Sequence, residues 1–425
     1  MRSTSTLALT AAVGVVGIAL APAATADAPD DSVAYLAAQI EAGDGRLTTE
    51  SGGQTFDDLG LTIDAVASMS AAGSGGDVSA TATDYLVDNA AGYVGSGDEV
   101  YSAATAKMLT LASVRGLDPR DVGGVDLVAQ LQGLEEDGQF VDRSEYGDYS
   151  NTLGQAFGLI GLERAGVNPS TASVDALLAQ QCDDGGFTLE FGGDCVSDPD
   201  ATSTAVQALE TVGGHDDAVQ DAADFLEGRQ EPDGGVGGGA TTEAANTNST
   251  GLAAIAFDIA GRDDARAAAL GYVESLTFDC DTPAIAGAIA YDKSEFDTLT
   301  AEGEDAAATG TSTRATAQAL LGVAGESWGT VTAEGQSAAT PTPDCEGSAP
   351  TPGDDAGSDD DATGDDASSG NDASSGAGDS PEIPAVVQTD GGAAGGSSGL
   401  LALGAGGLAA VVTLALRRRG AEQRH

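Results

Sequence analysis

Polar side chains recur near the start of several otherwise apolar segments, and they are the candidates for chemistry in this chain. Aligning the segments places six residues at one position: Asp64, Lys107, Gln155, Gln207, Leu252 and Gln318. Two residues earlier lie Thr62, Thr105, Thr250 and Thr316. Polar side chains that converge with free helix N-terminal amides make a pocket for an amide-rich or hydroxyl-rich ligand. Helix capping is the competing interpretation, because Thr and Asp are good N-caps.

The predicted ligand-binding set extends this pattern to neighbouring polar and aromatic residues. Tyr101 precedes one of the segments and is either an apolar wall of the pocket or part of the core. We expect replacement of Gln155 and Gln207 by alanine to weaken ligand binding and to leave folding intact. The full set is Thr62, Asp64, Tyr101, Thr105, Asn151, Gln155, Thr204, Gln207, Thr250 and Gln318.

Histidine and cysteine usage limits the catalytic and metal chemistry. The chain has two histidines, His215 and His425, so it offers too few histidine side chains for a His-dependent triad or a zinc site in the folded region. The sequence therefore predicts no catalytic residue, no metal and no cofactor. The four cysteines allow three pairings, and we predict two disulfides, Cys182 with Cys195 and Cys280 with Cys345. A thiolate metal site is the alternative, which the absence of a Cys-x-x-Cys pair disfavours.

The segments that position these residues belong to a repeat. Each unit has an apolar run ending in Gln, then an Asp-Gly-Gly turn, then a second apolar run, as in Val174–Gln181, Asp184–Phe187 and Asp200–Leu209. Counted from Gln39, the units recur every 43 to 50 residues, which is typical of repeated supersecondary units. Each unit reads as two amphipathic helices, with no stretch of strand length and period two. Six such hairpins close into a ring or form an open superhelix.

The recurring Gln followed by Asp-Gly-Gly-Phe resembles the repeat of the prenyltransferase and squalene cyclase superfamily, over roughly residues 31–325. Phe140 and Phe187 follow the glycines in two units, and Val236 takes this place in another. The resemblance implies an all-α fold, an (α/α)6 toroid of six helical hairpins with the second helices inside.

The residues that catalyse in that superfamily have no counterpart here. Its cyclases use an Asp-x-Asp-Asp motif, and its protein prenyltransferases hold zinc with Asp, Cys and His. The string in this chain that is most similar to the cyclase motif, Asp279-Cys280-Asp281-Thr282, lacks the third carboxylate. An aromatic content of 4% also argues against carbocation chemistry. Among the branches of that superfamily, the chain therefore resembles the non-catalytic cobalamin carriers, transcobalamin and intrinsic factor. This resemblance implies a cobalamin-like ligand at the toroid mouth. Those carriers close a small β domain over the ligand, and this chain would need a partner as its lid.

Both ends of the chain point to the cell surface. Residues 1–26 read as a signal peptide, with Arg2 before an apolar core and a small-residue cleavage site. After the predicted toroid (27–335), residues 336–396 form an acidic Pro/Gly/Ser/Asp-rich stalk that we expect to be disordered. Residues 397–425 hold one hydrophobic transmembrane segment and a basic tail. The stalk, the hydrophobic segment and the basic tail together resemble a cell-wall sorting signal, in which a sortase would cut at Thr389. A simple membrane anchor is the alternative.

Charge excludes some partners. The 16 basic and 68 acidic side chains give a net charge of -52, which repels nucleic acid and anionic lipid. The sequence therefore predicts a non-catalytic, surface-tethered protein that binds a small molecule. One candidate ligand is a corrinoid that the protein binds for uptake. Its expected protein partners are a membrane transporter or a lid protein. A terpenoid-processing enzyme and a structural surface protein without a small ligand are the alternatives.

Overall fold

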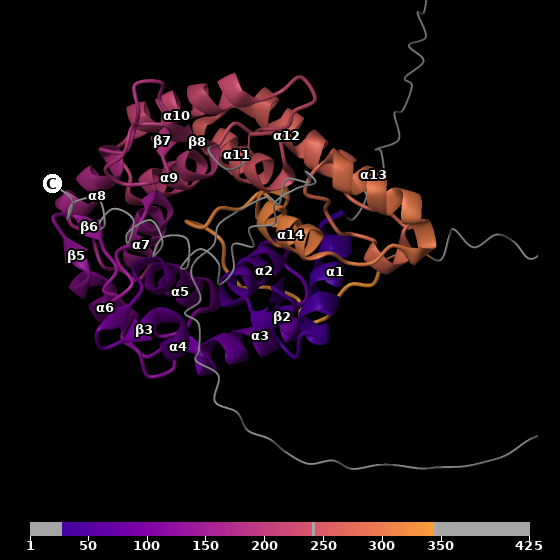
Figure 1. The fold of residues 1–425 in the computed structure, drawn as a ribbon, viewed down its shortest axis with the longest axis horizontal. Coiled ribbons are helices and arrows are strands. Elements are labelled where there is room, and N and C mark those ends of the chain that lie inside the picture. Colours follow the sequence, from indigo (N-terminus) through magenta and orange to yellow (C-terminus); the bar gives the residue numbers. More distant parts are fainter. Residues whose placement is uncertain (1–27, 240–242, 344, 346–425) are drawn as a thin grey trace, which may run out of the picture.

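The computed structural model describes residues 28–239, 243–343 and 345, so the predicted signal peptide, Thr389 and the C-terminal hydrophobic segment lie outside the described residues. The described residues are mainly paired helices (Figure 1). Within them, no helix combines the length and the apolar character needed to cross a membrane. The second helices of the six units are α2 (Leu59–Ala72), α5 (Ser102–Arg115), α7 (Thr152–Arg164), α9 (Pro199–Val212), α11 (Thr247–Ala260) and α14 (Gly310–Val323). The first helices are α1 (Ala28–Ala42), α3 (Gly76–Asp88), α6 (Leu127–Gly133), α8 (Thr171–Leu178), α10 (Asp216–Arg229) and α12 (Asp263–Ser275).

The second helices form a closed inner ring. Each packs against the next one along the chain, and α14 packs against α2 (Figure 1). The Ser68 hydroxyl donates to the Ala317 carbonyl, 2.7 Å away, across this last contact. The first helices lie outside, each on the inner ring, as α1 lies against both α14 and α2. The open superhelix that the sequence allowed is therefore not the arrangement of the described residues.

Small residues let the inner helices approach each other closely. These helices are buried on nearly all sides, because each contacts two inner neighbours and an outer helix. A Cβ atom on Gly251 of α11 would lie 2.7 Å from the Ala319 Cα atom of α14. A Cβ on Gly322 of α14 would lie 2.3 Å from the Gly251 carbonyl oxygen. Glycine is therefore needed where α11 and α14 touch.

The glycine turns join one unit to the next. Gly185 has a φ of 90°. A Cβ there would lie 2.3 Å from the carbonyl oxygen of Asp221 in α10, the outer helix of the following unit. Gly287 of the last unit would meet the Asp31 carbonyl oxygen of α1 in the same way, at 2.1 Å. The repeated glycine thus closes the outer layer of the ring as well as the inner one.

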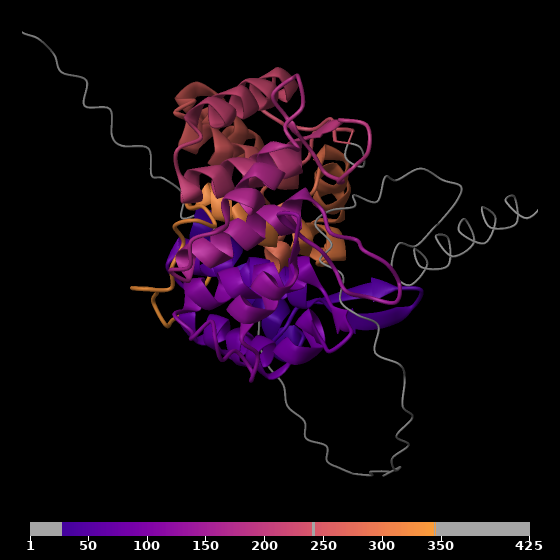
Figure 2. The same cartoon turned by 90° about the vertical axis from the view of Figure 1, so that its left-hand side faces the viewer.

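The connections between outer and inner helices contain short strands, which the sequence analysis did not expect. Asp137 (φ 50°) and Gly138 (φ 91°) form a turn with two left-handed residues, and such turns favour tight antiparallel hairpins. Four two-stranded antiparallel sheets result among the described residues. The hairpin of β1 and β2 projects beyond the helices at the right of Figure 2. The paired strands are β1 (Thr48–Ser51) with β2 (Gln54–Asp57), β3 (Gly95–Ser96) with β4 (Glu99–Val100), β5 (Glu135–Glu136) with β6 (Gln139–Phe140), and β7 (Phe187–Thr188) with β8 (Ser197–Asp198).

Further short helices complete the connections. They are α4 (Ala90–Val94), η1 (Pro283–Ile285), α13 (Lys293–Glu302) and η2 (Gly303–Asp305). The last three belong to the connection between α12 and α14.

The folded body continues past the boundary expected at residue 335. The backbone N–H of Ala333 donates to Val114 at the end of α5, at 2.9 Å, and that of Ser337 donates to Gly73 after α2, at 2.8 Å. The Gln336 side chain accepts a hydrogen bond from Arg115 at 2.7 Å. The chain after α14 therefore crosses the C-terminal ends of the inner helices before any stalk begins. We call residues 324–339 the crossing segment.

Both predicted disulfides form. Cys182 pairs with Cys195 in the connection that precedes α9, and Cys280 pairs with Cys345 beyond the crossing segment. The pairing of all four cysteines is thereby confirmed. The second disulfide joins the chain after the crossing segment to the connection between α12 and α14.

Candidate functional site

A cavity of about 30 Å³ lies at the centre of the inner ring. That volume holds roughly one or two water molecules. Every inner helix contributes one residue at an equivalent position, namely Asp64, Lys107, Phe157, Thr204, Leu252 and Gln318. The remaining lining residues are Ser68, Leu153, Asp200, Ala317, Leu321 and Trp328.

One side of the cavity is a directed chain of polar side chains. The Lys107 ammonium lies 2.7 Å from one Asp64 carboxylate oxygen, and both side chains are buried, with 1% and 6% exposed. Gln318 donates its amide N–H to the other Asp64 oxygen, at 3.3 Å. Asn248, on α11, donates its own amide N–H to the Gln318 carbonyl oxygen, at 2.5 Å. Asp64 is thus an acceptor for two neighbours, and the chain of donors runs toward it.

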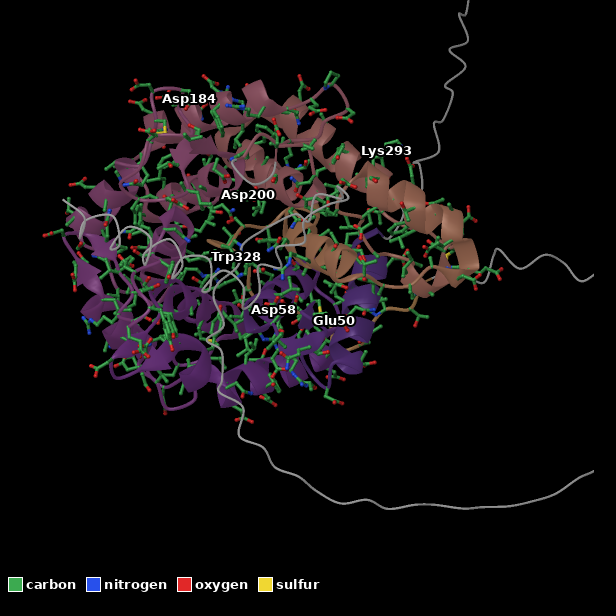
Figure 3. All side chains as sticks on the ribbon, viewed as in Figure 1. Glu50, Asp58, Asp184, Asp200, Lys293 and Trp328 are labelled. Atoms are coloured by element: carbon green, nitrogen blue, oxygen red, sulfur yellow. A yellow bond between two sulfur atoms is a disulfide. The ribbon has the colours of Figure 1, made fainter. Side chains whose placement is uncertain are left out.

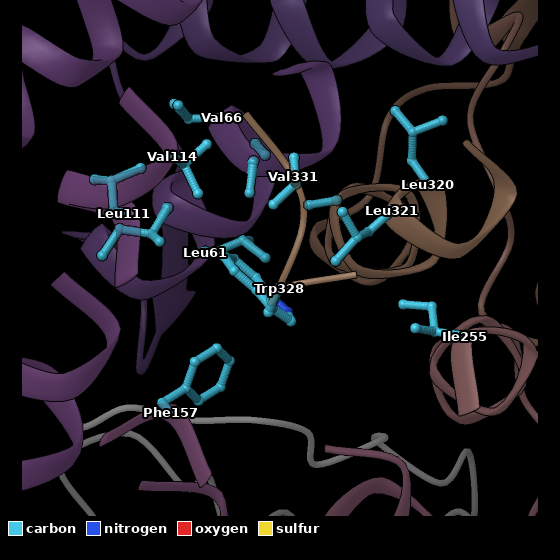
Figure 4. Packing of buried hydrophobic residues seen from close by; sticks show 14 of the residues in the cluster. Leu61, Val66, Leu111, Val114, Phe157, Ile255, Leu320, Leu321, Trp328 and Val331 are labelled. Carbon is cyan, nitrogen blue, oxygen red and sulfur yellow. The ribbon is translucent and has the colours of Figure 1, made fainter. Parts of the chain in front are cut away.

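Another part of the lining is aromatic. Phe157 and Trp328 meet edge to face, with ring centroids 5.1 Å apart (Figure 4). The Lys107 nitrogen lies 5.6 Å from the centre of the Phe157 ring. At this distance the negative face of the ring attracts the ammonium, so Phe157 supports the ion pair from the apolar side.

Trp328 closes the cavity from the crossing segment. Its backbone N–H donates to the Gln207 side chain, at 3.0 Å, and its carbonyl accepts from Arg164. Arg164 also donates to the Val331 carbonyl, at 2.5 Å. Trp328 and Asp200 lie toward the centre of the ring, whereas Asp184 and Lys293 lie at its periphery (Figure 3). The floor of the cavity is therefore supplied by a segment outside the repeats.

Exposed tyrosines stand at the N-terminal ends of α5 and α7. Tyr146 and Tyr149 are 52% and 47% exposed, and Tyr101 is the N-terminal cap residue of α5. Burial and the neighbouring Glu99 carboxylate raise the pKa of Tyr101 to about 12, so its hydroxyl is protonated at neutral pH. Hydrogen bonding from the backbone of Glu145 lowers the pKa of Glu99, which keeps that carboxylate ionised. This tyrosine cluster (Tyr101, Tyr146 and Tyr149) is aromatic, and the neighbouring Glu99 carboxylate adds a negative charge beside it.

Three residues of the predicted binding set line the cavity: Asp64, Thr204 and Gln318. Tyr101 belongs to the tyrosine cluster, and Asn151 caps α7 by accepting from the Gly154 N–H, at 3.0 Å. Neither of these two residues lines the cavity.

Three of the predicted threonines, Thr62, Thr105 and Thr250, make buried contacts and do not line the cavity. Thr250 donates its hydroxyl to the Asn246 carbonyl and accepts the Val236 N–H, at 2.8 Å. Thr62 accepts the Leu47 N–H in the same manner, at 3.0 Å, and Thr105 accepts from the Gln130 side chain. The hydroxyls of Thr62 and Thr250 hold the connections before their helices, and that of Thr105 contacts α6. The binding role of these three threonines stays a prediction.

Gln155 and Gln207 of the predicted set do not line the cavity either. Gln155 accepts the Phe140 N–H, at 3.0 Å, and donates to the carbonyls of Gly138 and Ser173, at 2.9 and 2.8 Å. It therefore occupies the threonine position of its unit, and Phe157, two residues later, takes the place at the cavity. Gln207 lies one turn below Thr204 and holds Trp328. Aligning the units by polar residue type shifted both glutamines out of register.

Gln155→Ala should therefore reduce stability, contrary to the expectation from the sequence. The substitution leaves buried backbone groups of residues 138, 140 and 173 without their partner, which should cost about 2 kcal/mol or more. Urea unfolding followed by circular dichroism measures the change. Gln132→Ala, at an exposed position, is the matched control and should alter stability by less than about 0.5 kcal/mol. Equal effects of the two substitutions would contradict the anchoring role.

Several cavity residues were missing from the predicted binding set. Lys107 and Leu252 stood in the alignment but were left out of the set, and Phe157 and Asp200 were not considered. For Lys107, Phe157 and Leu252 the spacing contains the signal, because each follows the anchoring Thr or Gln of its helix by two positions. Trp328 carries no such signal, because it lies outside the repeat.

No protein-family model and no curated protein matches the sequence. Among solved structures, a protein from Actinoplanes is similar over 70% of this chain and 99% of its own, with 21% identity and a TM-score of 0.53. The type II terpene cyclase MstE from Scytonema, without ligand, is similar over 70% of this chain and 98% of its own, with 17% identity and a TM-score of 0.51. These likenesses show a shared fold, the α/α toroid that the repeat implied.

Proposed function

We propose that this chain is a non-catalytic binding protein, tethered at the cell surface, that takes the polar end of a small molecule into the central cavity of the toroid. The observation that carries the proposal is the chain of Lys107, Asp64, Gln318 and Asn248, of which the first three line the cavity. The rest of the ligand would lie outside the cavity, where the tyrosine cluster offers exposed aromatic surface.

Stability alone is a poor reason for this polar chain. Burying an ion pair costs desolvation free energy that its mutual attraction often fails to offset, and apolar residues of similar volume are frequently as stable. Most of the other buried positions of the inner helices hold apolar or small uncharged residues. A charged pair beside a cavity in such a core favours recognition of a ligand.

The cavity size restricts the ligand. Pockets that enclose a whole drug-sized molecule measure about 300–1,000 Å³, and this cavity is far smaller, at about 30 Å³. A prenyl chain would therefore not fit inside it, which disfavours the alternative of a terpenoid-processing enzyme. A corrinoid would have to rest across the tyrosine cluster, and a partner protein would have to supply its lid.

The tether rests on the two ends of the chain. The predicted signal peptide, stalk and C-terminal hydrophobic segment would hold the toroid outside the membrane, and the two disulfides accord with export into an oxidising compartment. Cleavage at Thr389 would attach the protein to the cell wall, and retention of the hydrophobic segment would leave it in the membrane. A transporter would be the natural partner for a ligand captured there.

The first test is identification of the bound ligand. Mass spectrometry of the natively purified full chain should reveal a co-purifying small molecule, and calorimetry with cobalamin, its precursors and isoprenoids tests these classes directly. Gln318→Leu should weaken binding by about tenfold or more, since it removes hydrogen bonds at the cavity wall. Gln220→Leu, on the exposed face of α10, is the matched control and should bind normally. Absence of any ligand would favour the structural surface protein instead.

A further inference from the structure

The large hydrophobic residues that stay exposed in the described part of the chain all lie on two adjacent connections. Tyr146 and Tyr149 precede α7 and Val196 precedes α9, with 52%, 47% and 58% of their surfaces exposed. The two connections contact each other, because the Thr152 backbone N–H donates to the Leu189 carbonyl at 2.9 Å. Exposed apolar residues that gather in one place are typical of interaction sites, whereas single ones are ordinary. We call residues 141–151 and 189–197 together the aromatic face.

Hydrogen bonds and a disulfide fix both connections of the aromatic face. Asp142 accepts the Ser102 backbone N–H of α5, at 2.7 Å. Glu99 of β4 accepts the backbone N–H of the residue before Tyr146, at 2.8 Å. The disulfide at Cys195 closes the other connection. A surface that is fixed before binding loses little conformational entropy when a partner docks.

The aromatic face is acidic. It holds one cation, Arg143, whose guanidinium donates to the Gly133 carbonyl. Carboxylates around exposed aromatic rings repel an anionic surface and attract a cationic one, so charge complementarity favours a basic partner. The carboxylates of this face are Asp142, Glu145, Asp148, Glu190 and Asp194.

Arginine matches both parts of this surface. Its planar guanidinium pairs with carboxylates and stacks on aromatic rings, whereas the lysine ammonium is more strongly hydrated. The chain itself contains such an arrangement, since the Arg46 guanidinium lies 4.9 Å from the centre of the Tyr85 ring and 2.6 Å from an Asp57 carboxylate oxygen. Tyrosine and arginine are also enriched among the residues that contribute most to protein–protein binding.

We propose that the aromatic face docks a basic protein partner, whose exposed arginine side chains stack on Tyr146 and Tyr149 and pair with the surrounding carboxylates. The partner is a polypeptide, because nucleic acid and the anionic leaflet of a membrane carry the wrong charge. This inference goes beyond the proposed function, since it holds whether or not a small molecule occupies the cavity.

The experiment is a calorimetric titration of the full chain with a hexa-arginine peptide in 0.15 M NaCl, where charges more than about 8 Å apart are largely screened. Hexalysine, of equal charge, should bind at least about threefold more weakly, because it lacks the planar guanidinium. Maltohexaose, a neutral sugar chain, should not bind. Hydrogen exchange of residues 141–151 should slow when hexa-arginine is bound, and that of α10 should not change.

The double variant Tyr146→Ser, Tyr149→Ser should weaken the binding of hexa-arginine by about fivefold or more, because it removes two exposed ring faces. It should also abolish the preference for hexa-arginine over hexalysine. Tyr146→Phe, Tyr149→Phe keeps both rings, so it is the matched control and should bind like the parent.

A second pair of variants tests the charge, and it decides the question even if the Tyr146→Ser, Tyr149→Ser variant does not fold. Glu145→Gln, Glu190→Gln removes two exposed carboxylates from the aromatic face and should weaken the binding of hexa-arginine several-fold. Asp216→Asn, Asp217→Asn removes the same charge from the exposed first turn of α10, which follows the C-terminal end of α9, and should bind like the parent.

Three results would overturn the docking proposal. Absence of hexa-arginine binding would do so directly. Equal binding of hexa-arginine and hexalysine, or an equal loss in the two charge variants, would show general attraction to an acidic chain. Binding of maltohexaose that depends on Tyr146 and Tyr149 would make the aromatic face a saccharide site. None of these results bears on the small-molecule proposal, which Gln318→Leu tests at the cavity.

Discussion

Lys107→Met should lower the free energy of unfolding by about 3–5 kcal/mol, because it leaves the buried Asp64 carboxylate without its cation. Methionine has nearly the length of lysine, so the packing against Phe157 changes little and the loss reports mainly on charge. Urea unfolding followed by circular dichroism measures the effect, provided that the slope of the transition is unchanged.

The chain supplies a matched control for this substitution. Lys293 is the other lysine of the sequence, and it pairs with Asp297 at 2.7 Å on the exposed surface of α13. Lys293→Met should cost no more than about 0.5 kcal/mol, since exposed pairs of this spacing contribute little. The double variant Lys107→Met, Asp64→Leu should recover most of the loss, because it removes both buried charges. A double variant as unstable as Lys107→Met alone would show that packing, and not the unpaired carboxylate, causes the loss.

Trp328→Ala should also cost about 3–5 kcal/mol, which is typical of removing a buried aromatic side chain. Trp328 is 4% exposed, contacts Phe157 edge to face, and forms the floor of the cavity (Figure 4). Its loss should release the crossing segment locally, because Gln207 and Arg164 then hold a backbone that lacks its buried anchor. Calorimetric melting and hydrogen exchange of residues 324–339 measure the two effects.

Trp328→Phe is the control for this substitution. It keeps an aromatic ring against Phe157, so it should cost about 1–2 kcal/mol and leave hydrogen exchange in the crossing segment nearly unchanged. Fast exchange in residues 324–339 of the unsubstituted protein would contradict the view that this segment is a fixed part of the toroid.

Much of the fold could be predicted from the sequence, because it is repeated locally. Each Asp-Gly-Gly turn lies between two apolar helical runs, and one such hairpin leaves an apolar face uncovered. The repeat of about 43–50 residues therefore predicted paired helices and six units. The disulfide pairs could be predicted as well, since Cys182 and Cys195 flank one connection and the other two cysteines remain. The strands were missed because they are two to four residues long and depend on the turn more than on their own pattern.

The candidate site could be predicted only in part. Asp64, Thr204 and Gln318 were identified by type, but Gln155 was given the position that belongs to Phe157. Threonine and glutamine can both accept a backbone N–H, so residue type does not reveal which polar side chain anchors a loop and which faces the axis. Only the hydrogen bonds to Phe140, Gly138 and Ser173 separate the two roles.

The sequence by itself determined the local elements of this protein: helices from apolar periodicity, turns from glycine, and an acidic chain with an even number of cysteines. Tertiary structure alone decided that the ring closes, through contacts between α14 and α2, and that Trp328 lines one end of the cavity. Both features join residues that are far apart in the chain, as Trp328 and Gln207 are, and no local pattern encodes such contacts. Closure depends on the sum of small rotations between successive hairpins, which is settled only when all six pack together.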